Sequence, residues 1–227
     1  MVNRLREAAL KELGLWPLWR QKLASSPLPA ANADGAEAPA IASEWTTLES
    51  QVAACRACAL HRTRTKAVFG VGDAQADWLF VGEAPGAEED AKGEPFVGPA
   101  GKLLDNMLKS IGLRRGDDVY IANVLKCRPP RNRNPQPQEV AHCEPYLKRQ
   151  IELIQPRLIV TLGKFAAQTL LGREQSIASL RGRLHDYQGV PLIVTYHPAY
   201  LLRSLQDKAK AWEDLCLARE TMARSSA

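Results

Sequence analysis

The sequence lacks any apolar run of the roughly 20 residues that a transmembrane helix needs, so we expect no membrane partner. It also lacks a secretion signal, because the opening segment, MVNRLREAALKELGLWPLWR, carries charges where such a signal is apolar. No internal repeat is present. We therefore expect a cytoplasmic protein, in a compartment where disulfides are rare.

Only five cysteines are present, but four of them have the spacing of metal ligands. Cys55 and Cys58 form a Cys-x2-Cys pair, and Cys127 and Cys143 follow after a gap of 68 residues as a Cys-x15-Cys pair. A tight pair reaches one metal centre from a single turn, and folding must bring in the distant pair. The spacing matches neither common ferredoxin run, so on the residues alone both zinc and an iron–sulfur cluster stay open.

The positive charge is unevenly distributed. The formal net charge is only +5, yet one stretch of eight residues holds four cations and no acid: Lys126, Arg128, Arg131 and Arg133. A second basic cluster follows the first cysteine pair: His61, Arg62, Arg64 and Lys66. Clusters of this kind indicate contact with a phosphate backbone, and a solvated loop with no partner is the alternative.

Two parts of the chain differ in composition. Residues 1 to about 20 have apolar side chains at helical spacing, and Ser25–Ser43 is rich in Ala, Pro and Ser. We expect an N-terminal helix and a flexible linker over residues 1–43, and one folded, monomeric domain over residues 44–227. Two roles are open for the N-terminal arm: binding a replication or repair partner, or packing on the core.

Within the expected domain, short apolar runs alternate with helical patterns. The runs are Trp78–Val81, Val119–Val124, Leu158–Leu162 and Leu192–Tyr196. The helical patterns are Ala100–Ile111, Glu139–Ile154, Lys164–Leu171 and Asp207–Met222. This alternation predicts an α/β protein with three α/β/α layers, in which helices cover both faces of a mostly parallel four-stranded sheet.

Three loops follow these predicted strands and have unusual chemistry. They are Gly82–Gly86 (GEAPG), Asn123–Pro135 and His197–Arg203 (HPAYLLR). Since functional loops of such sheets lie beyond the carboxyl ends of the strands, we expect the three loops to converge on one site.

Each loop region carries a residue suited to binding a base. Phe96 lies in a glycine-bounded loop and can stack on a base, or cap the core edge. The amide of Asn123 matches the N3–H and O4 of uracil and opposes cytosine, unless it only forms a turn. His197 can bond a leaving group or be structural, and the apolar tip Tyr200–Leu202 can wedge into a base stack.

Taken together, these motifs resemble those of family 4 uracil-DNA glycosylases. The resemblance rests on the GEAPG turn, the GEPFVGPAGKLLD run from Gly93 to Asp105, Asn123 followed by KCRPPRNR, and HPAYLLR. It covers residues 45 to about 215, and the four cysteines fall where that family carries its [4Fe-4S] cluster. It implies an enzyme that flips uracil out of single- or double-stranded DNA and hydrolyses the N-glycosidic bond, which places it with the DNA of the nucleoid.

The resemblance also implies roles for individual residues. Phe96 stacks on uracil, Asn123 reads its N3–H and O4 edge, and His197 faces O2. Residues that complete the uracil site are Gly82, Gly86 and Glu89, the last of which crowds C5 against thymine. The catalytic residues are Glu83, His197 and Asn132, with Asn132 helping to place water. DNA contacts come from Arg128, Arg131, Arg133, Arg203 and the wedge Leu201. The cluster ligands are Cys55, Cys58, Cys127 and Cys143.

Two features bear on the mechanism. The best-known uracil glycosylases have a carboxylate immediately before the proline of the first loop, but here that residue is Ala84, as in the family that the chain resembles. Catalysis would then depend on electrostatic stabilisation of the sugar and of the departing uracil anion. A related family traps uracil-DNA on a loop histidine, and Arg128–Pro137 contains none. The alternatives to a glycosylase are a non-catalytic or a uracil-trapping iron–sulfur protein.

Overall fold

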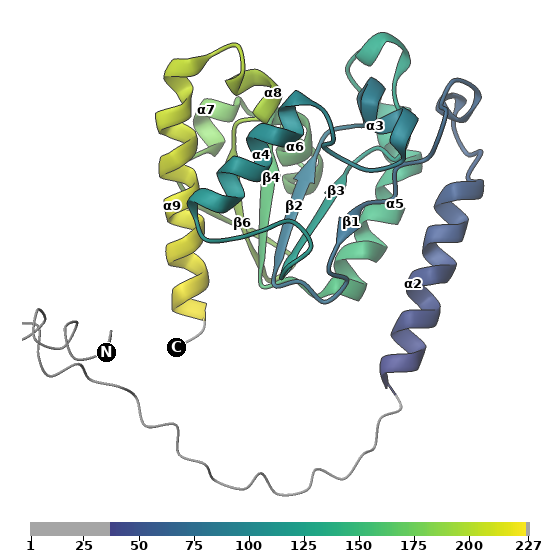
Figure 1. Ribbon diagram of the computed structural model, residues 1–227, viewed down its shortest axis with the longest axis horizontal. Helices are drawn as coiled ribbons and strands as arrows, with labels where there is room; N and C mark the ends of the chain where they lie inside the picture. Colours follow the sequence, from purple (N-terminus) through teal and green to yellow (C-terminus); the bar gives the residue numbers. More distant parts are fainter. Residues whose placement is uncertain (1–36, 226–227) are drawn as a thin grey trace, which may run out of the picture. The chain divides into compact units, whose positions relative to one another are not determined.

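The computed structural model describes residues 37–225 (Figure 1). The predicted helix over residues 1–20 and most of the predicted linker lie outside the described residues. The helix α2 (Glu37–Ala54) includes residues 37–43, which the sequence pattern had placed in the linker. A helix can begin there because a segment rich in alanine favours a helix and proline is tolerated in a first turn.

The sheet has six strands in the order β1-β3-β2-β4-β6-β5. The strands are β1 (Val71–Gly72), β2 (Trp78–Gly82), β3 (Val119–Asn123), β4 (Leu158–Leu162), β5 (Leu184–Tyr187) and β6 (Val190–Thr195). The four central strands pair in parallel, which confirms the predicted parallel core. The edge strands β1 and β5 are antiparallel, and the sequence did not reveal them because one has two residues and the other is half-exposed.

The helices lie on both faces of the sheet, as predicted for three layers. They are α2, α3 (Ala87–Lys92), α4 (Pro99–Ser110), α5 (Pro137–Ile154), α6 (Lys164–Leu171), α7 (Ile177–Leu180), α8 (Pro198–Leu201) and α9 (Lys208–Ser225). In the part of the chain that the structure describes, the 3-10 helices are η1 (Ala59–Arg62), η2 (Pro130–Asn132) and η3 (Leu205–Asp207). None of the helices within residues 37–225 combines the length and the apolar composition of a membrane span.

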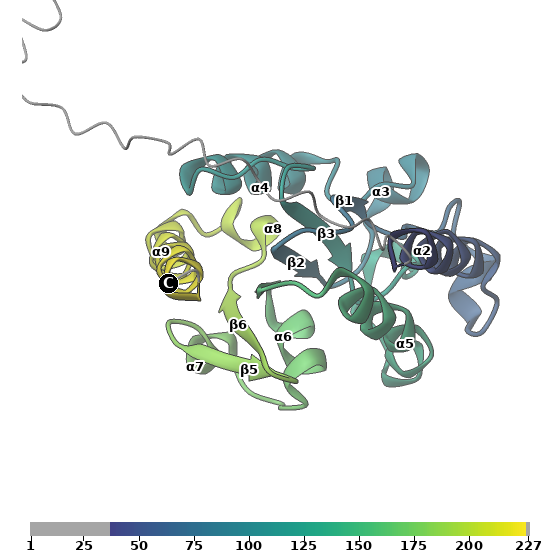
Figure 2. The same ribbon diagram turned by 90° about the horizontal axis from the view of Figure 1, so that it is seen from below.

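The two hydrophobic cores follow from strand alternation. Along β2, Trp78 and Phe80 face one core with side chains of α4 and α9, whereas Leu79 and Val81 face the other with side chains of α5 and α6. Figure 2 shows α4 and α9 on one side of the strands and α5 and α6 on the other. Because both faces are covered, the ligand-accessible part of the central strands is their carboxyl end.

Candidate active site

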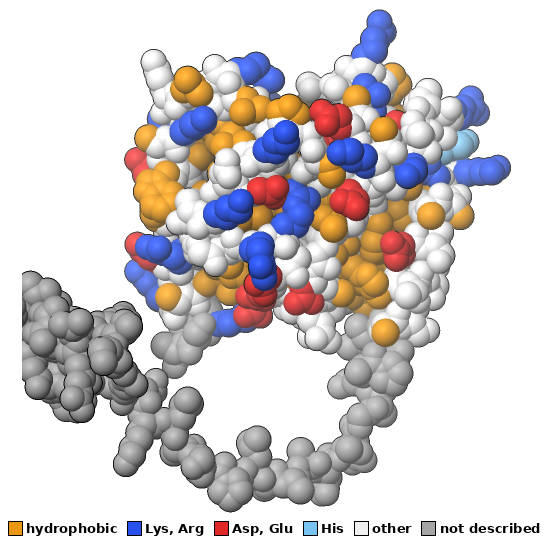
Figure 3. Space-filling model, viewed as in Figure 1, with side chains coloured by type: hydrophobic (Ala, Val, Ile, Leu, Met, Phe, Trp, Pro, Cys, Tyr) orange, Lys and Arg blue, Asp and Glu red, His pale blue; other side chains and the backbone are white. Residues whose placement is uncertain are grey.

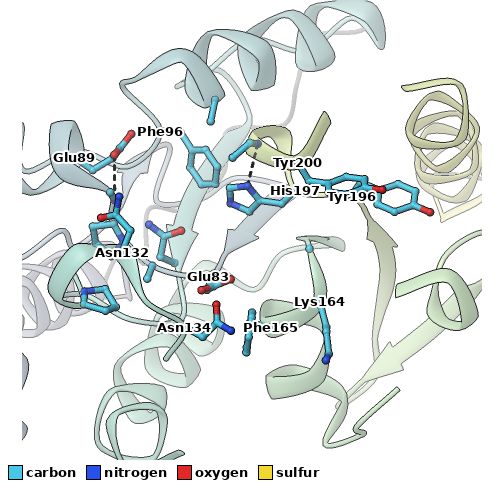
Figure 4. A pocket seen from close by; sticks show the side chains of 18 of the residues that line it. Glu83, Glu89, Phe96, Asn132, Asn134, Lys164, Phe165, Tyr196, His197 and Tyr200 are labelled. Carbon is cyan, nitrogen blue, oxygen red and sulfur yellow. Dashed lines mark hydrogen bonds between the residues drawn. The ribbon is translucent and has the colours of Figure 1, made fainter. Parts of the chain in front are cut away.

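The three predicted loops converge on one pocket of about 760 Å³. Its walls include Glu83 and Gly86 from the first loop, Asn123, Asn132 and Arg133 from the second, and His197 and Arg203 from the third. Glu89 of α3 and Phe96, which lies between α3 and α4, line the same pocket. Figure 4 shows the rings of Phe96 and His197 side by side, with Glu83 below both of them in this view. Every element that contributes these residues follows a parallel strand, as the sheet topology requires.

Phe96 has a strained backbone and a close-packed ring. Its φ of 55° is in the left-handed region, which is unusual for an aromatic residue. Its carbonyl accepts a hydrogen bond of 2.8 Å from Arg115, whose other nitrogens bond the Pro95 carbonyl and Asp105. A Cβ at Gly101 in α4 would collide with the same Phe96 carbonyl. The strain is therefore held by packing and by three hydrogen bonds from one guanidinium.

Gly82 lies at the end of β2, where a larger residue would block the pocket. A Cβ there would collide with Asn123 Oδ1 and would lie 2.6 Å from the ring of Phe96. Gly82 does not line the pocket itself. Its contribution is to let the side chains of Phe96 and Asn123 approach one another.

Glu89 joins two of the pocket loops. Its carboxylate accepts hydrogen bonds from the backbone N–H groups of Gly86 at 3.1 Å, Val97 at 3.0 Å and Gly98 at 3.2 Å. These three bonds hold the GEAPG turn and the loop that carries Phe96 in fixed positions relative to one another. The structure thus gives Glu89 a positioning role that the sequence did not reveal.

Asn123 is the last residue of β3 and is only 2% exposed. Its Oδ1 is buried and has no hydrogen-bond partner within the described part of the chain. Buried side-chain oxygens are normally paired, and leaving one unpaired costs about 1–3 kcal/mol. An unpaired acceptor in a pocket wall indicates a ligand that brings its own N–H donor.

His197 caps α8 and is held neutral. Its Nδ1 accepts a hydrogen bond of 3.1 Å from Ala199 N–H, so the neutral ring carries its proton on Nε2. Burial, together with the Arg203 cation, lowers the pKa of His197 to about 4. Its ring stacks on Phe96 with centroids 5.5 Å apart. At neutral pH the site therefore presents an uncharged N–H donor beside the aromatic ring.

Glu83 follows β2 directly and lies in the pocket wall. Burial raises the pKa of this carboxyl to about 7. A carboxyl with such a pKa changes its charge near neutral pH, which is the range in which a group that assists proton transfer works best.

The loop after β3 is held by its own cations. Arg133 makes a two-pronged ion pair with the buried Glu139 of α5, at 2.8 and 2.5 Å. Arg128 donates from Nε to Asn132 Oδ1 at 2.7 Å. Arg131 has no partner within residues 37–225, and it and Asn132 both have positive φ. Within the described part of the chain, Arg133 thus uses both terminal nitrogens in its ion pair, whereas Arg128 bonds through Nε alone and Arg131 makes no hydrogen bond or ion pair.

Figure 3 shows Lys and Arg side chains projecting from the end of the molecule above α3 and beside the loop that follows α2. Arg203, at the pocket wall, is exposed as well. These positions fit the basic surface that the sequence predicted.

The predicted wedge residue is not exposed. Leu201 is 1% exposed and packs in the core beneath α4, because the short helix α8 turns it inward. Its neighbours Tyr200 and Leu202 are 37% and 44% exposed. The structure thus places the predicted wedge residue in the core, and Leu202 is the exposed leucine of the same loop.

The four predicted metal ligands line a second, smaller cavity. Cys127 and Cys143 are buried, and Cys55 and Cys58 are partly buried. Cys143 Sγ accepts a hydrogen bond of 3.1 Å from the backbone N–H of Lys126. Burial raises the pKa of the Cys143 thiol to about 11, so ligation of a metal must release its proton.

Arg64 belongs to the cysteine cavity and not to a phosphate-binding surface. It donates to Cys127 Sγ at 3.0 Å and to the Ala53 carbonyl at 2.8 Å. Both terminal nitrogens of Arg64 are therefore engaged at the cysteine cavity. Within residues 37–225, no group of three or more His, Cys, Asp or Glu side chains is placed to hold a metal ion. The cysteines surround a cavity and do not close on one point.

Several pocket residues were missed at the sequence level. Lys164 and Phe165 line the pocket from the start of α6, and Tyr196 lines it from the end of β6. The rule that sites lie beyond the carboxyl ends of parallel strands would have found all three. No local sequence signal indicates Arg115 or Gly101, because their contacts with Phe96 arise only on folding.

The fold and the pocket define a class of protein. The chain belongs to the uracil DNA glycosylase superfamily, whose sequence profile matches residues 69–216. Within that superfamily it is similar to type-4 uracil-DNA glycosylases. The enzyme of Archaeoglobus fulgidus is 52% identical over 160 residues, which cover 67% of this chain and 80% of that protein. The enzymes of Thermotoga maritima and Sulfurisphaera tokodaii are 46% and 44% identical, over 72% and 76% of this chain and 85% and 82% of theirs.

Proposed function

We propose that this chain is a uracil-DNA glycosylase of type 4, which flips uracil out of DNA and hydrolyses the bond between base and sugar, starting base excision repair. The observation that carries the proposal is the buried, unpaired Oδ1 of Asn123 in a pocket that also holds Phe96 and a neutral His197. The similarity to type-4 uracil-DNA glycosylases supports the same reaction.

Recognition of uracil follows from the hydrogen-bonding pattern of Asn123. Uracil N3–H donates to Oδ1, and uracil O4 accepts from Nδ2. Cytosine offers an acceptor at N3 and a donor at C4, so both contacts would be lost. Phe96 stacks on the flipped base, and Glu89, fixed by its three backbone bonds, occupies the space that a thymine methyl would need.

The chemistry depends on charge that develops as the glycosidic bond breaks. His197 donates from Nε2 to uracil O2, and this bond strengthens as negative charge grows there. The Glu83 carboxylate lies on the sugar side, where it stabilises the electron-poor sugar and orients water in place of a side chain at Ala84. Asn132 assists in placing that water.

Contact with DNA uses the residues that the structure leaves exposed. Arg131 and Arg203 bind phosphates, and Leu202, beside Tyr200, fills the space that the flipped nucleotide leaves in a duplex. Arg128 and Arg133 act by holding the loop after β3.

The cysteine cavity fits a [4Fe-4S] cluster held by Cys55, Cys58, Cys127 and Cys143. In such a cluster each thiolate binds its own iron, so the sulfurs stand around a cavity, whereas zinc needs all four within about 2.3 Å of one point. These four residues lie in the turn after α2, the loop after β3 and the helix α5, which a bound cluster would cross-link. Anaerobically purified protein should be brown with about four irons per chain. Colourless protein with one zinc would contradict this assignment.

Release of free uracil from a dU oligonucleotide tests the function. We expect release from single-stranded and paired substrates, and loss of release in Asn123→Asp, whose carboxyl no longer matches the uracil edge. Tight binding without release would favour the non-catalytic alternative, and a covalent adduct would favour the uracil-trapping one.

The division into residues 1–43 and a glycosylase domain remains a proposal, with the described helix α2 extending the domain to Glu37. We place the protein with its substrate, the DNA of the cytoplasm, as a monomer. The N-terminal arm is proposed to bind a replication or repair partner, which a pull-down with and without residues 1–36 would test.

A further inference from the structure

Lys126 is a buried lysine whose ammonium group bonds only neutral oxygens. It is 1% exposed, and Nζ donates to the Asn123 carbonyl at 2.9 Å, the Phe69 carbonyl at 3.1 Å and Gln150 Oε1 at 2.5 Å. No carboxylate pairs with it within residues 37–225. An ammonium group has three donors, so every one is used. Burying such a charge is costly, and the three bonds offset that cost.

The three acceptors lie in three different segments. Asn123 ends β3, Phe69 precedes β1, and Gln150 is in the C-terminal half of α5. Gln150 is fully buried and also donates from Nε2 to the Phe69 carbonyl at 3.1 Å. The backbone N–H of Lys126 bonds Cys143 Sγ, and the next residue is Cys127. One side chain thus fastens the end of β3 to both a neighbouring segment and a helix.

The orientation of the Asn123 side chain depends on these hydrogen bonds of Lys126 more than that of an ordinary strand residue would. No hydrogen bond of its side chain is made within the described part of the chain, and Oδ1 is unpaired. The direction of its amide is therefore set by its backbone and by the close approach of Oδ1 to Gly82, where an added Cβ would collide with it. Lys126 holds that backbone at the carbonyl of Asn123 itself.

We infer that Lys126 is a positioning residue for base recognition: its ammonium group fixes the backbone of Asn123, so that the amide faces the base before uracil enters. The inference rests on the proposed role of Asn123 as the reader of uracil. It gives a functional reason for a buried charge. If only packing mattered, a methionine of similar shape would fill the same space at a lower cost in folding free energy.

A double-mutant cycle between Lys126→Met and Asn123→Ala tests this inference. Single-turnover excision is measured on a single-stranded dU oligonucleotide, with folding checked by thermal melting and by the visible spectrum. We expect Lys126→Met to slow excision about tenfold in the wild-type background, within the range of coupled residues. In the Asn123→Ala background it should slow excision by less than about twofold, because the group that it positions is gone.

Arg115→Met is the matched control. Arg115 holds the Phe96 loop and makes no bond to Asn123. It should therefore slow excision by the same factor with and without the Asn123 amide. A factor for Lys126→Met that is equally large in both backgrounds would overturn the inference and reduce Lys126 to a structural residue.

Two further arrangements keep the test decisive. If Lys126→Met does not fold, Gln150→Met removes one acceptor of the same ammonium group and enters the same cycle with the same expected outcome. If wild-type protein binds but does not release uracil, the cycle is run on binding constants for the dU oligonucleotide. If the proposed chemistry fails, the wild-type protein does not release uracil. If the inference fails, the effects of the Lys126 and Asn123 substitutions are additive.

Discussion

Two buried polar regions, around Lys126 and around Asn123, lie three residues apart along the chain. They differ in whether every polar group has a hydrogen-bond partner. Around Lys126 every donor of the ammonium group has a partner, and the oxygen that it shares with Gln150 is bonded twice. Around Asn123, the side-chain Oδ1 has no partner within residues 37–225, and the nearby Glu83 carboxyl is raised in pKa to about 7 by burial.

The difference separates structure from function. A satisfied polar network stabilises one arrangement of the chain, whereas an unsatisfied group is kept, against its cost, where a ligand will complete it. Substitutions in the unsatisfied region should therefore change activity more than stability, and those in the satisfied region should do the reverse unless they act through the pocket.

The largest effect is expected at His197. Replacing it by Ala removes the donor to uracil O2, and excision should slow by roughly a hundredfold, or about 3 kcal/mol, with little loss of uracil-DNA binding. His197→Asn keeps a donor and should recover part of the rate. Single-turnover rates beside binding constants measure both. His185→Ala, on the edge strand β5, is the control, and equal rates for His197→Ala and wild type would refute the leaving-group role.

The two neighbouring leucines of the third loop should behave in opposite ways. Leu202→Ala should lower the ratio of duplex to single-strand excision rates about tenfold, because burial of a leucine in the base stack is worth roughly 1.5–3 kcal/mol. Leu201→Ala should instead destabilise the fold by roughly 2–5 kcal/mol, as in other cores. Melting curves and rates on both substrates decide, and an unchanged ratio in Leu202→Ala would exclude it as the wedge.

Glu83→Gln should trade activity for stability. The folded-state pKa of Glu83 is raised to about 7, above its unfolded value of 4.5. The folded protein thus favours the protonated form, and this stability is lost as the pH rises from 4.5 through 7. Glu83→Gln should melt above wild type at pH 8, by about 2 to 4 °C for each kcal/mol of this cost, and less so at pH 5. Parallel melting temperatures across this range would contradict the buried-carboxyl interpretation.

The pH profile of excision gives a second test of the same residue. If ionised Glu83 assists at the sugar, the wild-type rate should rise with pH through about 7, and the Glu83→Gln rate should lack this rise.

The smallest effect is expected to separate Arg131 from Arg133 in the loop after β3. Arg131→Ala should weaken binding to all DNA alike and reduce the slope of log affinity against log salt by roughly 0.9. Arg133→Ala should leave that slope nearly unchanged and lower the melting temperature, because its partner Glu139 is buried. A change of slope in Arg133→Ala alone would show that its ion pair opens on DNA.

The sequence predicted the parallel core and the convergence of three loops because both depend on local patterns. Continuous apolar runs such as Leu158–Leu162 identify buried strands, and the loops that follow them must meet at one edge. The orientation of side chains within those loops was not predictable. Leu201 turns inward because it packs against α4, which is distant in the sequence. Arg133 pairs with Glu139 of α5, and the sequence pattern does not show this ion pair.

Cys143 and Gln150 are seven residues apart on α5, close to two full helical turns, so they lie on one face about 10 Å apart. One points to the cysteine cavity and the other to Lys126. The helix thus sets a fixed distance between the cysteine cavity and the hydrogen bonds around Lys126. Insertion of a single residue between these positions would rotate one face by about 100° relative to the other. The length of α5 in this interval should therefore tolerate substitutions but no insertions or deletions.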